Sequence, residues 1–364
     1  MLTAEKKYYP QLDSIRAFAF LSVFFYHTLH PSKGNTFVSN FFYLIWSNLH
    51  LGLDVFFVLS SFLLTFLGIK EFRKKGEFSI KNFYLRRILR IWPLYYLILF
   101  FSFVVLNYVK EKYAISITLP DASWYIFFIS NFYDKPHVFY LKMLWTLSVE
   151  EQFYILWGIC LLYFQKSILK VILVLFILSL LFNFISWYNN AQTYTNTFTY
   201  LLDMMVGAYA AYVLLNPNKI IRIILRVKGN WEKLFYTFLP ICFVIYFLLV
   251  SNVRLNFESL LDEIFRVLFV IYCGALILHQ MLNDTSFFNL KSNKFLIYTG
   301  KISYGLYCYH GIVITFTNIL LIKIGIHYNP FLVSILILAL TYLIASLSYK
   351  FLEKPFLKLK IKIE

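Results

Sequence analysis

The strongest chemical signal in this sequence is a cation and an imidazole within one apolar stretch, LDSIRAFAFLSVFFYHTLH. Arg16 and His27 are eleven residues apart, almost three turns of an α-helix, so both side chains should project from one face. Their rise along the helix would be about 16 Å. An imidazole exchanges protons near neutral pH, and a guanidinium binds anions. The stretch therefore predicts an anion site and a proton acceptor at two depths of one helix, for which Asp13 or Ser14 would supply the N-cap.

A second group of cations lies in RRILRIWPLYYL. Arg86, Arg87 and Arg90 sit at the start of an apolar helix, and guanidinium groups suit phosphate oxygens better than ammonium groups do. We interpret them as a phosphate-binding group that could join Arg16 in one anion pocket. Alternatively, these three arginines are ordinary cytoplasmic charge. For Arg16 the alternative is a side chain that reaches the membrane surface, and for His27 it is an interhelical hydrogen bond.

Carboxylates and a second histidine complete the candidate set. Asp54 lies early in LGLDVFFVLSSFLLTFLGI, where it could approach His27 and orient the imidazole. Glu150 opens an apolar helix in LWTLSVEEQFYILW, and His310 lies in the middle of another, KISYGLYCYHGIVI. Structural alternatives are an interfacial Asp54, a Glu150 favoured by the helix dipole, and a core histidine at 310. Two other embedded charges, Asp203 and Arg266, are candidates to pair with each other.

The elements that position these residues must cross a membrane. The 364-residue chain is 60% hydrophobic and 14% charged, which excludes an ordinary soluble domain. We expect an all-α membrane protein, residues 1–364 forming a single domain of about ten transmembrane helices, with no cleavable signal peptide. The predicted spans are 12–30, 50–69, 83–109, 144–164, 168–188, 197–215, 234–251, 263–281, 302–322 and 330–350. An eleven-residue apolar piece, ASWYIFFISNF, is too short to span.

The net charge of +16 fits membrane orientation better than nucleic-acid binding. Most of the 34 lysines and arginines fall in alternate connections of the ten-span arrangement, as the positive-inside rule requires. Both termini are therefore predicted to be cytoplasmic. Four cysteines lie singly in apolar runs, without disulfide or metal spacing, and no metal site is expected.

Taken together, these stretches resemble the acyltransferase family 3 of integral membrane proteins. The resemblance rests on LDSIRAFA with the following YH, LDVFFVLSSFLLT, RRILRIWPLYY, LWTLSVEEQFYILW, ISYGLYCYH and the terminal EKPF, in the family's order. Ser14 and Ser61 stand where the family usually has glycine. Some members carry an additional extracytoplasmic SGNH esterase-like domain, and the sequence predicts none here.

The resemblance implies O-acylation of a carbohydrate or glycolipid hydroxyl at the bacterial cytoplasmic membrane, with acyl-CoA, first of all acetyl-CoA, as the co-substrate and His27 as a catalytic residue. Arg16, Arg86, Arg87 and Arg90 would hold the coenzyme phosphates. His27 would act as general base on the acceptor, with Glu150, Asp54 or His310 orienting the base or the sugar. The alternative classes are a secondary transporter and a porter that passes an acyl group to a separate transferase. The sequence indicates no oligomeric state.

Overall fold

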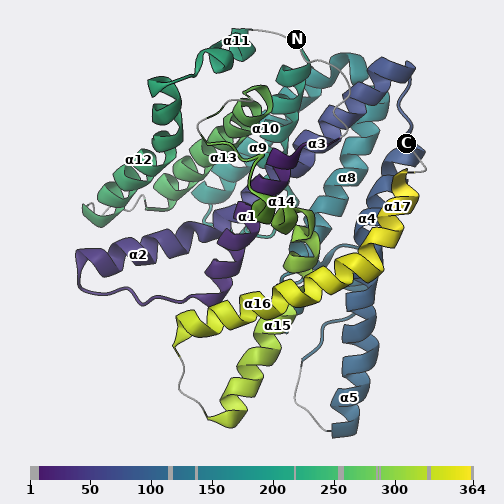
Figure 1. The fold of residues 1–364 in the computed structure, drawn as a ribbon, viewed down its shortest axis with the longest axis vertical. Helices are drawn as coiled ribbons and strands as arrows, with labels where there is room; N and C mark the ends of the chain where they lie inside the picture. The colour runs from purple at the N-terminus through teal and green to yellow at the C-terminus, as the bar shows by residue number, and fades with distance from the viewer. Residues whose placement is uncertain are drawn as a thin grey trace. The chain divides into compact units, whose positions relative to one another are not determined.

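A computed structural model describes residues 8–113, 118–135, 138–216, 219–252, 258–283, 286, 288–325 and 329–361. Every regular element among these residues is helical (Figure 1). The chain divides into two compact units. Unit 1 comprises Met1–Leu67, Ile172–Ala191 and Leu202–Ser303, and unit 2 comprises Gly68–Val171, Gln192–Leu201 and Tyr304–Glu364. We describe each unit by itself.

The helices follow the predicted spans closely. The long ones are α1 (Pro10–Thr28), α3 (Gly52–Lys75), α4 (Ile80–Phe100), α8 (Trp145–Tyr163), α9 (Ile168–Tyr188), α10 (Thr197–Leu215), α12 (Asn230–Asn252), α13 (Glu258–Leu282), α15 (Ser303–Ile324) and α16 (Pro330–Ser348). Shorter helices are α2 (Phe37–Asn48), α5 (Leu106–Tyr113), α6 (Ser123–Ile126), α7 (Phe139–Lys142), α11 (Lys219–Arg226), α14 (Lys294–Lys301) and α17 (Lys354–Ile361).

Seven helical stretches of the described residues are long and apolar enough to cross a membrane. They overlap seven of the ten predicted spans. The other three coincide with α1, α8 and α13, the helices that carry Arg16, Glu150 and Arg266. The structure thus confirms a multi-helix, apolar architecture, while the count of ten stays a prediction. The termini that the orientation prediction uses, residues 1–7 and 362–364, lie outside the described residues.

The predicted start of the first helix is wrong. The helix begins at Pro10, with Tyr9 as N-cap and no side-chain capping bond, because proline is favoured in the first turn, where its missing N–H costs nothing. Asp13 and Ser14 are therefore already inside the helix and use their oxygens elsewhere. Ser14 donates a hydrogen bond of 2.7 Å to the Leu290 carbonyl, and Asp13 pairs with Arg16.

Unit 1 depends on close helix crossings that small residues permit. A Cβ at Gly300 of α14 would lie 1.8 Å from the Asp13 carbonyl of α1. Likewise, a Cβ at Gly207 of α10 would lie 2.1 Å from the Val58 carbonyl of α3, and the Ser61 hydroxyl of α3 donates to the Met204 carbonyl of α10. Small residues allow helix backbones to approach closely in membranes, where packing contacts rather than water exclusion hold helices together. These crossings fix α1 and α3 within their unit.

Unit 2 joins α4, α8 and α15. The Tyr84 hydroxyl of α4 donates to the Ile155 carbonyl of α8 over 2.9 Å, and the Tyr304 hydroxyl of α15 donates to the Ile91 carbonyl of α4 over 2.7 Å. Pro93 lies inside α4 without ending it, and a π-helical turn, Phe101–Val105, follows. The three helices that carry the candidate residues of unit 2 are thereby tied to one another.

The short apolar piece of residues 122–132 does not form a spanning helix. It contains α6 and a separate 3-10 turn, Ser130–Phe132, with Phe128 between them in the left-handed region at φ 55°. Gln152 of α8 donates from Nε2 to the Phe128 carbonyl over 2.8 Å and to Asn131 Oδ1 over 2.9 Å. These bonds hold the irregular backbone against α8 and satisfy its carbonyl group. Non-helical backbone in a membrane protein needs such partners, because lipid offers none.

Candidate active-site residues

In unit 1, the single helix α1 carries both Arg16 and His27, so the predicted separation of about 16 Å along one rod applies. The Arg16 side chain is 12% exposed, and its Nη1 lies 2.7 Å from Asp13 Oδ1. Tyr8 donates to the other oxygen, Asp13 Oδ2, over 2.6 Å. A guanidinium presents its N–H donors in one fixed plane, so this carboxylate orients the whole group.

His27 lies in the last turn of α1 and is partly buried. Its ring contacts Tyr26, with the centroids 5.1 Å apart. Tyr26 in turn stacks on Trp46 of α2, whose indole N–H donates to the Tyr26 carbonyl over 3.0 Å. The helix end that presents His27 is therefore held by an aromatic cluster, an arrangement that keeps the imidazole in a defined place.

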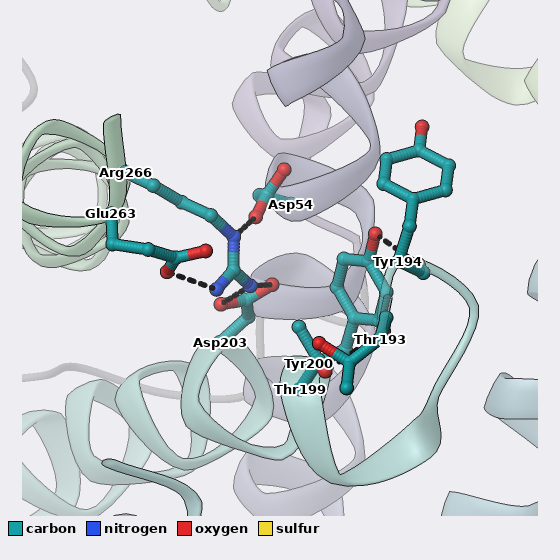
Figure 2. Close-up of polar contacts among 8 residues, drawn as sticks. All are labelled: Asp54, Thr193, Tyr194, Thr199, Tyr200, Asp203, Glu263 and Arg266. Atoms are coloured by element: carbon teal, nitrogen blue, oxygen red, sulfur yellow. Dashed lines mark hydrogen bonds and ion pairs between the residues drawn. The ribbon is translucent and has the colours of Figure 1, made fainter. Parts of the chain in front are cut away.

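Asp54 has a partner that sequence reasoning did not give it. The Arg266 guanidinium of α13 donates from Nε to Asp54 Oδ1 over 2.7 Å and from Nη2 to both oxygens of Asp203, over 2.8 and 2.9 Å. Figure 2 shows Arg266 reaching between the two carboxylates. Asp54 and Asp203 are almost completely buried, at 2% and 0% exposure. The predicted pairing of Asp203 with Arg266 is confirmed.

In unit 2, the three arginines of α4 differ in their surroundings. Arg86 is buried and donates from Nη2 to Glu71 Oε2 over 2.9 Å. Arg87 is also buried and lies close enough to Glu151 to act on it electrostatically. Arg90 is partly buried and acts in the same way on Glu353. Each guanidinium therefore has an acidic neighbour, which compensates its burial.

The carboxylate pair of α8 divides between two environments. Glu150 is partly buried and accepts a hydrogen bond of 2.5 Å from the Tyr154 hydroxyl, one turn later. Glu151 is the buried one, at 8% exposure, and it is also the one near Arg87. Successive residues of a helix point about 100° apart, so only one of two adjacent glutamates can face the same neighbour. Sequence reasoning selected Glu150 and left Glu151 out.

His310 is fully buried on α15, and its Nδ1 lies 2.5 Å from the Tyr307 carbonyl. Tyr307 connects this helix to the start of α8. Its hydroxyl donates to the Met143 carbonyl over 2.8 Å and accepts from Thr146 over 2.7 Å. The beginning of the helix that carries Glu150 is thus fixed to the helix that carries His310.

Glu353 is a second buried carboxylate that the candidate set omitted. It belongs to the terminal EKPF element, accepts from the Ser348 hydroxyl over 3.4 Å, and is 6% exposed. Gly305 makes room for it, since a Cβ there would lie 2.9 Å from Glu353 Oε1. The sequence signal for it was its position inside a recognisable motif, ahead of a proline. The described residues contain no cluster of histidine, cysteine, aspartate and glutamate suited to a metal.

Comparison with known proteins identifies the family. The family model described as an acyltransferase domain, that of the acyltransferase family 3, matches residues 9–350. The chain belongs to this family of membrane acyltransferases. The matched residues contain every stretch on which the resemblance rested except the terminal EKPF.

Two relatives illustrate the family. The chain is 28% identical to the peptidoglycan O-acetyltransferase OatA of Listeria monocytogenes, over 97% of this chain and 56% of that protein. It is 30% identical to YrhL of Bacillus subtilis, provisionally named a peptidoglycan O-acetyltransferase, over 97% of this chain and 55% of that protein. The chain therefore spans little more than half the length of these relatives. No solved structure matches it.

Proposed function

We propose that this chain is a membrane-bound O-acyltransferase that moves an acyl group, first of all acetyl, from cytoplasmic acyl-CoA to a hydroxyl of a cell-surface carbohydrate. Family membership supports acyl transfer. The names of the relatives support a cell-wall polysaccharide as the acceptor. The observation that carries the proposal is the placement of Arg16 and His27 on one unbroken helix.

The proposed chemistry begins with the donor. Acyl-CoA is an anion at its phosphates and a thioester at the far end of its pantetheine arm. For the phosphates we propose the guanidinium groups of Arg16, Arg86, Arg87 and Arg90, because charge-assisted, forked hydrogen bonds favour phosphate oxygens. The buried acidic neighbours of these arginines would orient the planar guanidinium groups before the coenzyme binds.

His27 is the proposed general base. The imidazole would take the proton of the acceptor hydroxyl as its oxygen attacks the thioester carbonyl, and the coenzyme thiolate would leave. Glu150 and His310 are proposed to orient the base or the acceptor. Asp54 also stays in the proposed set. Its role would be indirect, because its ion pair with Arg266 fixes α3 to α13 in the unit that contains α1.

We further propose that the chain lies in the bacterial cytoplasmic membrane and crosses it ten times.

The test compares His27→Ala with the parent protein. Because a general base contributes about 100-fold to 10,000-fold, the variant should lose at least 100-fold of its acetyl transfer while still inserting into the membrane. The measurement is base-labile acetate on isolated cell-wall polymers, by mass spectrometry, from cells with and without the gene. His30→Ala provides a matched control for the loss of an imidazole. His30 is exposed just beyond α1 and its ring contacts Trp46, with the centroids 5.5 Å apart, so this variant should keep most of the activity. Unchanged acetylation in His27→Ala would refute the role of His27.

The transporter and porter alternatives need separate tests. Acetyl-CoA should raise the thermal stability of the purified protein if the protein holds the coenzyme. A transporter of other solutes would give no shift. Acetyl transfer by the purified protein alone to isolated cell-wall polymers then separates an enzyme from a porter, because a porter needs a second transferase for the ester to appear.

A further inference from the structure

The connection between α10 and α12 contains an amphipathic helix that the proposed transfer reaction does not use. In α11, KIIRIILR, the cations Lys219, Arg222 and Arg226 recur three and four residues apart and so share one face. Ile221 is buried, and Ile220 and Ile224 pack against the core of unit 1. A short helix with a cationic face and an apolar face is typical of a membrane interface.

A groove lies between α11 and α12, entirely within unit 1. It has a volume of about 420 Å³ and is lined by Ile223, Arg226, Val227, Trp231, Leu234, Phe235 and Phe238. Apolar side chains form most of its wall, and Arg226 is its only charged one. Trp231 is 70% exposed, Ile223 61% and Leu234 50%. This volume falls within the usual range of small-molecule sites.

The charge around the groove has one sign. Arg222, Arg226, Lys228 and Lys233 are all exposed. The one acidic residue in residues 219–233 is Glu232, and it is buried and accepts from the Ser286 hydroxyl over 2.6 Å. The acidic side chain is therefore buried within unit 1, whereas the four cations are exposed.

A buried polar network holds the α12 wall of the groove in place, and the buried Ile221 anchors α11. Tyr236 of α12 contacts His279 Nδ1 at 3.1 Å and the Ser286 hydroxyl at 3.0 Å, and Gln280 donates to its oxygen over 2.5 Å. The His279 ring also stacks on Phe235, a lining residue, with the centroids 5.2 Å apart. Because the start of α12 is fixed to the end of α13, the groove is part of the folded structure and does not require a ligand to form.

We propose that this groove binds one anionic phospholipid, with an acyl chain along Trp231, Leu234 and Phe238 and the headgroup phosphate on Arg222 and Arg226. The apolar wall suits a hydrocarbon chain better than a soluble anion, and exposed tryptophan is typical of the membrane interface. Basic pockets beside membrane helices on the cytoplasmic side bind such headgroups. The positive-inside distribution predicts that residues 219–233 lie on that side, where anionic lipid would meet them.

The experiment measures lipid binding to the full-length protein in detergent by native mass spectrometry, with phosphatidylglycerol as the probe and phosphatidylcholine as the comparator. We expect one phosphatidylglycerol to bind in preference to phosphatidylcholine. Each surface cation contributes about fivefold to anionic-lipid binding, so Arg222→Gln/Arg226→Gln should bind phosphatidylglycerol about 25-fold more weakly. Arg222→Lys/Arg226→Lys should keep most of the binding. Lys170→Gln, which removes an exposed cation of unit 2, should match the parent protein.

A second variant tests the apolar wall independently. Trp231→Ala should weaken phosphatidylglycerol binding severalfold while keeping the preference for the anionic headgroup, and it removes an exposed side chain, so folding should persist. Equal binding of the two lipids by the parent protein would overturn the proposal. So would parent-level phosphatidylglycerol binding in the Gln/Gln variant, or in Trp231→Ala.

Discussion

At the scale of the single residue, the guanidinium groups are the most constrained feature. Burying a cation in a membrane protein is costly unless an anion accompanies it, and each candidate arginine has one. Asp13 pairs with Arg16 and Glu71 with Arg86, while Glu151 and Glu353 act on Arg87 and Arg90. The carboxylates compensate the burial and also orient the planar groups. A coenzyme phosphate would then meet donors that need little rearrangement, which is the advantage of a preorganised site.

This arrangement gives a prediction for Arg16. Arg16→Gln removes one charge-assisted hydrogen bond, worth about 1.5–3 kcal/mol, so the KM for acetyl-CoA should rise about 10-fold to 100-fold. The kcat should change much less, because the thioester chemistry is assigned to His27. Initial rates in membrane vesicles as a function of acetyl-CoA concentration measure both values. The KM of Arg16→Lys should lie between those of the parent protein and Arg16→Gln. Lys170→Gln should leave both the KM and the kcat unchanged. A fall in kcat at constant KM would assign Arg16 to the chemical step instead.

At the scale of the element, the ion cluster around Arg266 connects three helices of unit 1. Asp54 comes from α3, Asp203 from α10 and Arg266 from α13. Glu263, one turn before Arg266, adds a longer contact of 3.8 Å from a side chain that is 40% exposed. Removing one partner of a buried ion pair leaves an uncompensated charge, whereas removing both is far less costly. The cluster should therefore make the packing of these helices cooperative.

The corresponding prediction is a double-mutant cycle. Arg266→Met should lower stability by about 3–5 kcal/mol, because it leaves two buried carboxylates without their cation. Asp203→Ala should cost less, because Asp54 still compensates Arg266, and the double variant should lose less than the sum of the two. Thermal and denaturant unfolding in detergent measure these differences. Asp134→Asn, an exposed carboxylate of unit 2, should stay within about 0.5 kcal/mol of the parent protein. Strictly additive losses would mean that the two side chains do not stabilise the fold through each other.

At the scale of the whole molecule, the apolar segments could be predicted because hydropathy is a local property. The predicted span 197–215 coincides with α10, and 168–188 coincides with α9. Partners could not be predicted in the same way. Asp54 and Arg266 are 212 residues apart, and only the tertiary packing brings them together.

One wrong prediction and one choice between neighbours have equally physical causes. Asp13 has the residue type of an N-cap, yet Pro10 starts the helix one turn earlier and converts Asp13 into the partner of Arg16. Glu150 and Glu151 are chemically identical, and no local property says which will be buried. Packing decides it, and Glu151 is the buried one.

The orientation of the chain provides the last prediction. Lysine and arginine mark cytoplasmic connections because they resist translocation, and an even number of spans places both termini on the same side. Residues 110–143 connect the third and fourth predicted spans, so cytoplasmic termini place them outside. Alkaline phosphatase inserted there, after Asp134, should therefore be active, since this enzyme needs the oxidising exterior to form its disulfides. The same reporter fused after Glu364 should be inactive, whereas a green fluorescent protein there should fluoresce. Active phosphatase at the carboxyl end would mean an odd number of crossings or the opposite orientation, and Arg86, Arg87 and Arg90 would lose their assignment to a cytoplasmic coenzyme.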